Sequence, residues 1–444
     1  MSADTFRLVV GFDHHDGRVP SNGPANPPLH LLVTGEPGFL FGRDAVDVRR
    51  GDQGGNVDAD LSGPLDQAAD QVLPANRSTL SDGGIERIEP LACFVRVCVW
   101  KLLDEVVDDH VAPDAVSQED TRALSLRASR KLAAMEIPIY QDVLTAAQRI
   151  ESYVHRTPVL TSATLNRETR SEVFFKCENL QKVGAFKARG ATNAVLALSD
   201  EDAARGVATH SSGNHGQALA YAASVRGIPA WVVMPDHAPD VKVNAVLGYG
   251  AEVVFCKQAE REERTQQLVE EVGATLIHPY DNADVIAGQG TAALELIAEI
   301  PDLDTIVAPV GGGGLLGGTT IVAGSVERGI RVVGGEPEAV DDAFRSIRDG
   351  IRHPGVPEPK TIADGLLTGL GERNFDILNG RVEIVTVSEK EIVDAARFFV
   401  ERMKLVVEPS GAVSLAAARR LDLAGARVGV IVSGGNTDFR WLDR

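Results

Sequence analysis

The chain has 444 residues, 44% of them hydrophobic and 24% charged, so it is long enough for two or three globular domains. Its 44 Lys and Arg residues against 63 Asp and Glu residues give a net charge of −19, which argues against nucleic acid or an anionic membrane as the main partner. The sequence lacks a secretory signal and any apolar run of the ~18 residues that a membrane helix needs, so we expect a cytoplasmic protein.

Residues 1–134 differ in composition from the rest of the chain. They are rich in Gly and Pro, contain no Lys before Lys101, and show little helical or alternating apolar period. Such a segment buries too little apolar surface to form a packed core. We therefore predict that residues 1–134 are an N-terminal extension, disordered or a mis-assigned start, and that the main folded unit begins at Met135. A small accessory domain is the alternative.

From Met135 onward, short apolar runs typical of β-strands alternate with segments of helical period. Strands that alternate with helices indicate a doubly wound α/β architecture with largely parallel sheets. Ser388 and Glu391 form a capping box before apolar residues at helical spacing, which predicts a helix that starts there. The expected strands lie at residues 173–176, 206–209, 230–234, 252–256, 275–277, 305–310, 331–333, 383–387 and 428–432.

The first candidate functional residue is Lys187, which follows a strand and a polar turn that contains Gly184. Its neighbours Ala185, Phe186 and Ala188 are apolar, so we expect the lysine to lose hydration. Desolvation lowers the pKa of a lysine and favours the free amine that a Schiff base requires. A lysine near a helix start is more often a solvated surface group, so this segment alone does not identify a site.

A second candidate segment lies between the strand at 206–209 and the following helix. It consists of small polar residues, which present backbone N–H groups and hydroxyls to an anion such as a carboxylate. The alternative is a plain turn in which a serine caps the helix. The residues are Ser211, Ser212, Gly213, Asn214 and His215.

Four consecutive glycines, Gly311, Gly312, Gly313 and Gly314, follow the strand at 305–310 and precede a helix. Such a loop lets phosphate oxygens approach the backbone N–H groups at a helix N-terminus. The spacing from Gly312 to Gly317 also satisfies a dinucleotide fingerprint, and Glu336 closes the next strand. An NAD-dependent oxidoreductase is therefore an alternative hypothesis.

Two further features follow predicted strands. Ser433 lies at the end of the last apolar strand, where ligands bind in α/β sheets. The segment from Glu336 to Asp342 concentrates carboxylates, which suits a hard divalent cation, although a solvated acidic loop is the commoner meaning of such a run.

In this order and spacing, the motifs resemble those of the fold-type II pyridoxal phosphate (PLP) enzymes, in the serine/threonine dehydratase and serine racemase branch. The resemblance covers residues 140–439. It implies a two-domain α/β fold like that of the tryptophan synthase β chain, with parallel and mixed sheets flanked by helices. The small domain would span residues 204–283, and the large PLP-binding domain would combine 135–203 with 284–444. It also implies a homodimer that binds a small amino acid substrate.

The resemblance assigns roles to the candidate residues. Lys187 would hold PLP covalently and act as the base at Cα, and Phe186 would pack beside the cofactor ring. Asn214 would contact the ring hydroxyl, Ser433 the pyridine nitrogen, and Gly311, Gly312, Gly313 and Gly314 the phosphate. Ser211, Ser212 and His215 would line the substrate carboxylate site. Glu336, Asp342 and the Val340 carbonyl match a site for Mg²⁺ or another divalent cation, and Glu408 and Asp364 lie in further segments typical of the branch.

We predict an L-threonine/L-serine dehydratase that releases a 2-oxo acid and ammonia by β-elimination, with racemase side activity. Many threonine dehydratases of the branch carry Ala where Ser212 stands, whereas serine racemases carry Ser. The alternatives are a serine racemase or a dehydratase of another β-hydroxy amino acid such as 3-hydroxyaspartate. Glu263 stands roughly where vertebrate serine racemases have an Arg that reaches toward the substrate, which leaves substrate preference and nucleotide activation open.

Overall fold

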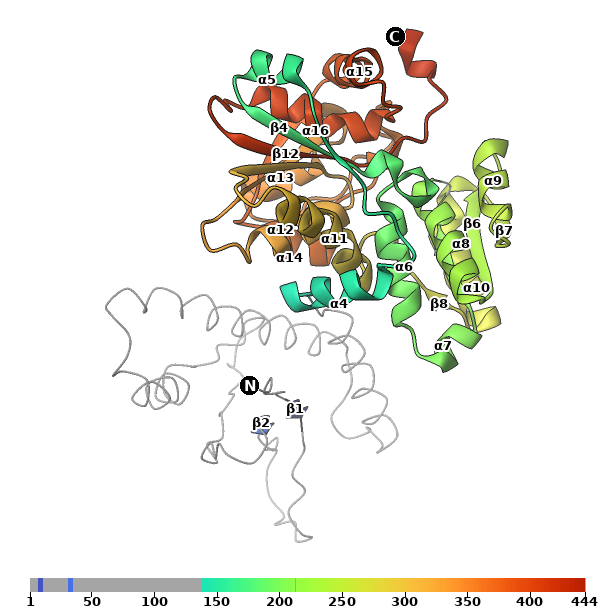
Figure 1. The fold of residues 1–444 in the computed structure, drawn as a ribbon. Coiled ribbons are helices and arrows are strands. Elements are labelled where there is room, and N and C mark those ends of the chain that lie inside the picture. The colour runs from blue at the N-terminus through green and yellow to red at the C-terminus, as the bar shows by residue number, and fades with distance from the viewer. Residues whose placement is uncertain (1–6, 11–30, 35–136, 212, 444) are drawn as a thin grey trace, which may run out of the picture. The chain divides into compact units, whose positions relative to one another are not determined.

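The computed structural model describes residues 7–10, 31–34, 137–211 and 213–443 (Figure 1). The chain divides into two units, Met1–Lys131 and Leu132–Arg444. In the first unit, strands β1 (Arg7–Val10) and β2 (Leu31–Thr34) pair antiparallel. The prediction that residues 1–134 form an extension therefore falls almost entirely outside the described residues.

A six-stranded mixed sheet forms the centre of the second unit. Its strand order is β11-β10-β9-β12-β4-β3, and every pairing is parallel except that of the edge strand β3 with β4. Helices cover both faces, which is why the central strands read as continuous apolar runs. The strands are β3 (Val159–Thr161), β4 (Glu172–Cys177), β9 (Thr305–Pro309), β10 (Arg331–Pro337), β11 (Glu383–Val387) and β12 (Arg427–Val432).

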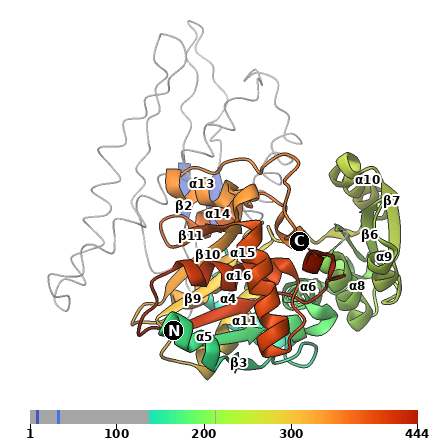
Figure 2. The same cartoon turned by 90° about the horizontal axis from the view of Figure 1, so that it is seen from above.

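A second, four-stranded sheet of order β7-β6-β5-β8 is parallel throughout. Seen from above, this sheet and its helices lie to one side of the six-stranded sheet (Figure 2). All four strands come from one stretch of chain inside the range predicted for the small domain, whose boundaries stay a prediction. They are β5 (Val207–His210), β6 (Ala230–Pro235), β7 (Glu252–Cys256) and β8 (Thr275–Leu276).

The helices bury four apolar clusters against the two sheets. On one face of the large sheet, α5, α15 and α16 share a core with β4 and β12, and on the other α4, α11 and α12 do so with β9 and β10. In the smaller sheet α8 and α9 cover one face and α10 the other. The α-helices are α4 (Tyr140–Ile150), α5 (Ala163–Thr169), α6 (Lys187–Ala197), α7 (Asp200–Ala204), α8 (Asn214–Arg226), α9 (Asp240–Leu247), α10 (Arg261–Val272), α11 (Ala283–Glu299), α12 (Gly314–Ala323), α13 (Asp342–Asp349), α14 (Glu372–Leu378), α15 (Glu389–Phe398) and α16 (Pro409–Arg420).

The sequence-based expectations for the second unit are confirmed at the level of the fold. All nine predicted strands are present, and the predicted capping box holds the start of α15, where Ser388 accepts from the Glu391 N–H while the Glu391 carboxylate accepts from the Ser388 N–H. Strand β3 was not predicted, because three residues are too short to show a period.

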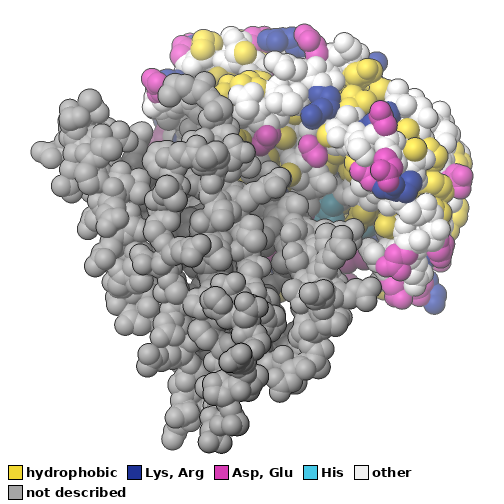
Figure 3. All heavy atoms as spheres, turned by 90° about the horizontal axis from the view of Figure 1, so that it is seen from below, with side chains coloured by type: hydrophobic (Ala, Val, Ile, Leu, Met, Phe, Trp, Pro, Cys, Tyr) yellow, Lys and Arg dark blue, Asp and Glu magenta, His cyan; other side chains and the backbone are white. Residues whose placement is uncertain are grey.

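The charge distribution on the surface and the apolarity of the helices are relevant to nucleic acid and membranes, the partners that the net charge argues against. On the face drawn in Figure 3, acidic and basic side chains lie interspersed among the described residues. Among the helices of the described part of the chain, none is both long enough and apolar enough to cross a membrane.

Candidate active site

Lys187 is the first residue of α6, in the position predicted from its sequence context. Between the end of β4 and this helix, the chain makes two short 3₁₀ turns, and Val183 and Gly184 adopt the left-handed conformation there, with φ of 56° and 72°. The Lys187 Nζ donates to the Pro279 carbonyl oxygen at 2.7 Å and lies 5.1 Å from the centre of the Phe186 ring. Burial without a carboxylate partner lowers the pKa of the Lys187 amine to about 8.

The predicted Ser433 segment lies directly against the Lys187 turn. The Phe186 N–H donates to the Ser433 carbonyl at 2.9 Å, the Gly435 N–H donates to the Gly184 carbonyl at 2.9 Å, and Ala185 bridges to Gly434. Ser433 is itself buried. The structure therefore brings together two segments that are about 250 residues apart in the sequence.

The glycine loop begins two residues after β9 and runs into the N-terminus of α12. Gly313 has a φ of +94°, which favours glycine. A Cβ on Gly312 would lie 2.2 Å from the Tyr280 ring, and one on Gly313 would lie 2.7 Å from Asn374 Cβ. Asn374 Nδ2 donates to the carbonyls of Gly312 and Tyr280 at 2.8 and 2.9 Å. Larger side chains are thus excluded from a loop that presents its backbone at a helix N-terminus, as a phosphate site requires.

The polar segment after β5 begins α8 at Asn214. Ser211 Oγ accepts from the Gly213 N–H at 3.3 Å, and Ser212 lies outside the described residues. His215 is 2% exposed, and its Nε2 donates to the Ile277 carbonyl at 3.2 Å. Burial first, and then the nearby Lys187, lower the pKa of His215 well below its usual range. The neutral ring of His215 therefore anchors the start of α8 to the chain after β8 through its hydrogen bond with Ile277.

The acidic segment forms two buried carboxyl sites rather than a solvated loop. Both oxygens of Glu336 accept from the backbone at the start of α13, from the N–H groups of Ala343 and Phe344 at 2.9 and 2.8 Å. Asp342 Oδ2 accepts from the Leu370 N–H at 2.8 Å, and burial raises the pKa of Glu336 to about 9. Within the described residues, no group of three His, Cys, Asp or Glu side chains is placed to hold a metal ion. The cation site of Glu336, Val340 and Asp342 therefore stays a prediction.

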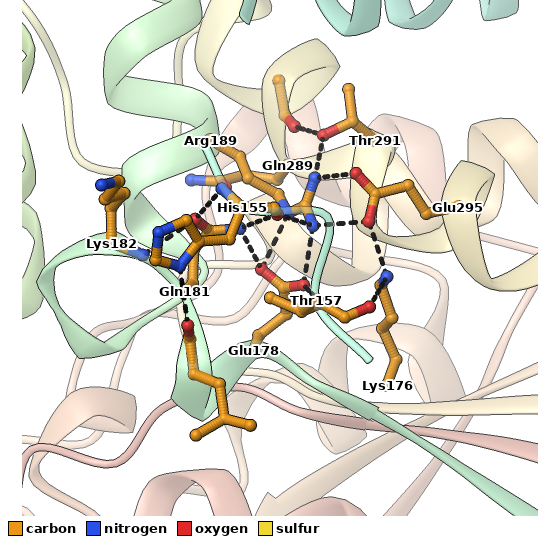
Figure 4. A network of polar contacts seen from close by, with 12 residues as sticks. His155, Thr157, Lys176, Glu178, Gln181, Lys182, Arg189, Gln289, Thr291 and Glu295 are labelled. Atoms are coloured by element: carbon orange, nitrogen blue, oxygen red, sulfur yellow. Dashed lines mark hydrogen bonds and ion pairs between the residues drawn. The ribbon is translucent and has the colours of Figure 1, made fainter. Parts of the chain in front are cut away.

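A buried network of charges holds the start of α6, and sequence reasoning missed it (Figure 4). Arg189, two residues after Lys187, is fully buried and binds two carboxylates with both of their oxygens: Glu178 at 2.7 and 2.8 Å, and Glu295 at 2.7 and 2.8 Å. Lys176 Nζ donates to Glu295 at 2.6 Å and to the Thr157 carbonyl at 2.7 Å. A lysine inside the apolar run of β4 was the signal that could have pointed to this network.

Two more site residues, Tyr280 and Asn374, were not predicted from the sequence, and the partner of Glu408, which was named only by resemblance, could not be read from local sequence. Tyr280 and Asn374 close over the glycine loop, and Glu408 accepts a hydrogen bond from Asn214 Nδ2 at 2.9 Å. Asn374 lies 62 residues from its partner Gly312 in the sequence, and Glu408 lies 194 residues from Asn214. The first contact follows from the packing of α14 against the start of α12, and the second joins the start of α8 to the N-terminus of α16.

Together these groups fit a cofactor with a phosphate, a carbonyl that an amine can attack and an aromatic ring. The glycine loop, a candidate phosphate cradle at the N-terminus of α12, packs so closely that a Cβ on Gly312 or Gly313 would clash with Tyr280 or Asn374. Lys187 supplies a desolvated amine. The Ser433 segment lies beside the Lys187 turn, and Asn214 meets the same loop through Asn436. All four features follow the carboxyl ends of parallel strands or the turns after them, where ligands bind in such sheets.

Residues 150–434 match the protein family described as pyridoxal-phosphate dependent enzyme. The serine racemase of Dictyostelium discoideum is 49% identical over 68% of this chain and 96% of its own length, and its crystal structure has a TM-score of 0.65 over 68% of this chain and all of that chain. The beta-hydroxyaspartate dehydratase of Paracoccus denitrificans is 48% identical over 69% of this chain and 98% of its own length. A solved threonine deaminase from T.th. is 46% identical, with a TM-score of 0.64 over 68% of this chain and 99% of that chain.

These comparisons confirm the predicted family and fold class and set aside the NAD-dependent alternative for the glycine loop. The curated relatives' names favour the predicted alternatives, serine racemase and 3-hydroxyaspartate dehydratase, over the main prediction of a threonine/serine dehydratase.

Proposed function

The chain belongs to the pyridoxal-phosphate dependent enzymes, and on that premise we propose that it acts on small β-hydroxy amino acids, with 3-hydroxyaspartate and serine as substrates. The reaction is β-elimination, in which the substrate loses its Cα proton and its β-hydroxyl as water. The enamine that is released then hydrolyses to a 2-oxo acid and ammonia. When bound, PLP supplies an electron-withdrawing ring that stabilises negative charge at Cα.

The observation that carries this proposal is the state and place of the Lys187 amine. Its pKa of about 8 makes proton uptake and release accessible near neutral pH, as a general base requires. The Nζ points to the Pro279 carbonyl, which follows β8, and so lies beside the chain that carries Tyr280 over the glycine loop. This position supports Lys187 as the base that takes the Cα proton of a substrate whose cofactor phosphate lies in that loop.

The other polar segments orient the reactants. The Ser211 segment at the start of α8 offers hydroxyl and backbone donors to the substrate carboxylate. Ser433 would meet the pyridine nitrogen with a neutral hydroxyl, which cannot balance a positive charge there as a carboxylate would. The ring is then a weaker acceptor of electrons, which favours rapid elimination over transamination.

Keto-acid release tests the proposal and ranks the substrates. The protein loaded with PLP is given L-threo-3-hydroxyaspartate, L-serine and L-threonine in separate assays, and the 2-oxo acid and ammonia are measured. We expect turnover of the first two to exceed that of threonine. If none of the three substrates releases keto acid, the proposed reaction is contradicted.

Serine racemisation is a second activity that the chain supports through Ser212. The hydroxyl at this position gives a second proton donor, and a relative that is 49% identical is a serine racemase. The Ser212→Ala variant should lose D-serine formation while it keeps elimination from L-substrates within about tenfold, less than the roughly 10²- to 10⁴-fold that one essential acid or base contributes. Chiral chromatography of the products measures both, and equal loss of both activities would refute the role of Ser212.

We also propose that Glu336, Asp342 and the Val340 carbonyl hold a divalent cation such as Mg²⁺. Two buried carboxyls and a carbonyl are oxygen ligands of the kind that hard cations prefer. Thermal unfolding with EDTA and then with added Mg²⁺ should show stabilisation by the cation, and the Asp342→Asn variant should lose it. The homodimer and the cytoplasmic location stay predictions.

A further inference from the structure

The Asn214 amide is held on both sides by protein groups. Its Nδ2 donates to Glu408 Oε1 at 2.9 Å, and its Oδ1 accepts from Asn436 Nδ2 at 2.9 Å. The Asn436 amide is fixed in turn, because its Nδ2 also donates to the Val183 carbonyl at 2.7 Å. The start of α8 thus contacts two segments that belong to the six-stranded sheet and its helices. These are the N-terminus of α16 and the loop after β12.

Glu408 occupies the N-cap of α16, but its side chain does not cap the helix. The side chain turns instead toward Asn214 and is only 3% exposed. Its position leaves no space around it, since a Cβ on Gly434 would lie 2.4 Å from Glu408 Oε1. The Glu408 side chain therefore serves the contact with Asn214 rather than the end of its own helix.

Burial raises the pKa of Glu408 to about 8, and the nearby Asp364 acts in the same direction. Hydrogen bonds from the Asn214 side chain and the Asn436 backbone lower it in part. The carboxyl therefore keeps a proton more readily than an exposed glutamate does, which limits its repulsion of an anionic ligand beside Asn214.

The two contacts fix which way the Asn214 amide faces. Asn436 Nδ2 can only donate and is held by the Val183 carbonyl, so a reversed Asn214 amide would place two donors together there; in the observed orientation Glu408 Oε1 accepts from Asn214 Nδ2. In the observed orientation one N–H of Asn214 Nδ2 serves Glu408, which leaves the second N–H for another acceptor. We propose that Glu408 and Asn436 are positioning residues that set the Asn214 amide so that this second N–H donates to the ring oxygen of the bound cofactor.

This inference rests on the proposed contact between Asn214 and the cofactor, and not on which substrate the enzyme uses. It is tested by the dissociation constant of PLP from the apoenzyme, measured by absorbance titration. Thermal unfolding of each apoenzyme is the control for folding. The variants are Glu408→Ala, Glu408→Gln, Asn436→Ala and Asn214→Ala, with Glu408→Ala also made in the Asn214→Ala background.

We expect Glu408→Ala to weaken PLP binding about tenfold, since it frees the amide that donates to the cofactor. Glu408→Gln should stay within about threefold of the wild type, because its amide oxygen can still accept from Asn214. In the Asn214→Ala background, Glu408→Ala should have almost no further effect on affinity, because the group through which it acts is gone.

Three results would overturn the inference. If the fold-changes in the PLP dissociation constant caused by Glu408→Ala and Asn214→Ala multiply in the double variant, Glu408 does not act through Asn214. A Glu408→Gln variant as defective as Glu408→Ala would point to charge rather than orientation. An Asn214→Ala variant with wild-type affinity would remove the cofactor contact itself, and keto-acid release by the same protein would show whether the proposed reaction survives.

Asn436 keeps the test decisive if the Glu408 variants do not fold. Its side chain is exposed, so Asn436→Ala leaves the core intact. We expect this variant to weaken PLP binding about threefold, as the loss of one weak polar contact does, with no effect in the Asn214→Ala background. Wild-type affinity in Asn436→Ala would refute its role.

Discussion

Two sets of buried ionisable groups lie near the start of α6, and their pKa values move in opposite directions. In the network of Figure 4, pairing lowers the pKa of Glu178 against its burial and raises that of Arg189. In the candidate active site, burial lowers the pKa of Lys187 and raises that of Glu408. The first set keeps its charges because every cation meets a carboxylate at close range. The second set favours neutral forms because burial outweighs its partners.

The difference shows how one protein uses buried charge for two purposes. Paired charges fix the position of Lys187, since Arg189 is two residues further along the same helix and binds Glu178 just after β4 and Glu295 on α11, which Lys176 of β4 also binds. Weakly paired groups supply proton exchange near neutral pH. A rigid support behind a reactive amine is the arrangement that precise catalysis needs.

Removal of Arg189 should break the support and have the largest effect on stability. The Arg189→Met variant leaves Glu178 and Glu295 without their main partner, and we expect it to lower the free energy of unfolding by about 3–5 kcal/mol. Urea unfolding of the apoenzyme measures this loss. Arg205→Met removes an exposed pair with Glu201 and Asp202 and should cost less than about 1 kcal/mol. Equal losses in the two variants would mean that the buried network does not support the fold.

A change at Gly312 should act on the site while sparing most of the fold. In Gly312→Ala the new Cβ would lie 2.2 Å from the Tyr280 ring, so the ring or the loop must move. Overpacking of this kind costs about 1–3 kcal/mol, which corresponds to roughly 5- to 150-fold weaker PLP binding if the loop moves. Gly324→Ala, at the other end of α12, is the matched control and should bind PLP as the wild type does. Unchanged binding by Gly312→Ala would refute the phosphate cradle.

A neutral replacement of Lys187 should change how the stability of the apoenzyme depends on pH, which tests whether burial leaves this amine weakly paired. Because folding lowers the pKa of Lys187 from 10.5 to about 8, the unfolded chain binds more protons between these values, and wild-type stability rises with pH across that window. Lys187→Met has no such titration. Its apoenzyme should therefore exceed the wild type in stability at pH 7, and the difference should shrink as pH rises from 8 toward 10.5. Urea unfolding at about pH 7 and about pH 10 measures it, and a difference independent of pH would contradict a desolvated amine.

The sequence predicted those parts of the site that have local signals. Lys187, the four glycines, Asn214 and Ser433 each follow a recognisable strand and precede or end a turn, so their neighbourhood in space follows from the parallel sheet. The paired charges left one local signal, Lys176 inside the apolar run of β4, and their pairing could not be read from it, because Arg189 and Glu295 are 106 residues apart and meet only when α6 packs on α11. The contact of Glu408 with Asn214 likewise depends on how the two sheets come together.

The choice of substrate was the prediction that the residues constrained least. The motifs that the sequence offers bear on the cofactor and on proton transfer, and none of them distinguishes one β-substituent from another. The prediction of threonine and serine therefore rested on resemblance alone, and the curated relatives shift the proposal toward 3-hydroxyaspartate and serine.

The central claim, that the Lys187 amine holds the cofactor, is tested by chemical trapping. The protein is incubated with PLP, reduced with borohydride, digested, and searched by mass spectrometry for a lysine that carries the cofactor. Lys187 should carry it, the Lys182→Ala protein should be labelled as the wild type is, and Lys187→Ala should not be labelled. Label on another lysine, or a Lys187→Ala protein that is labelled to the same extent, would contradict the account.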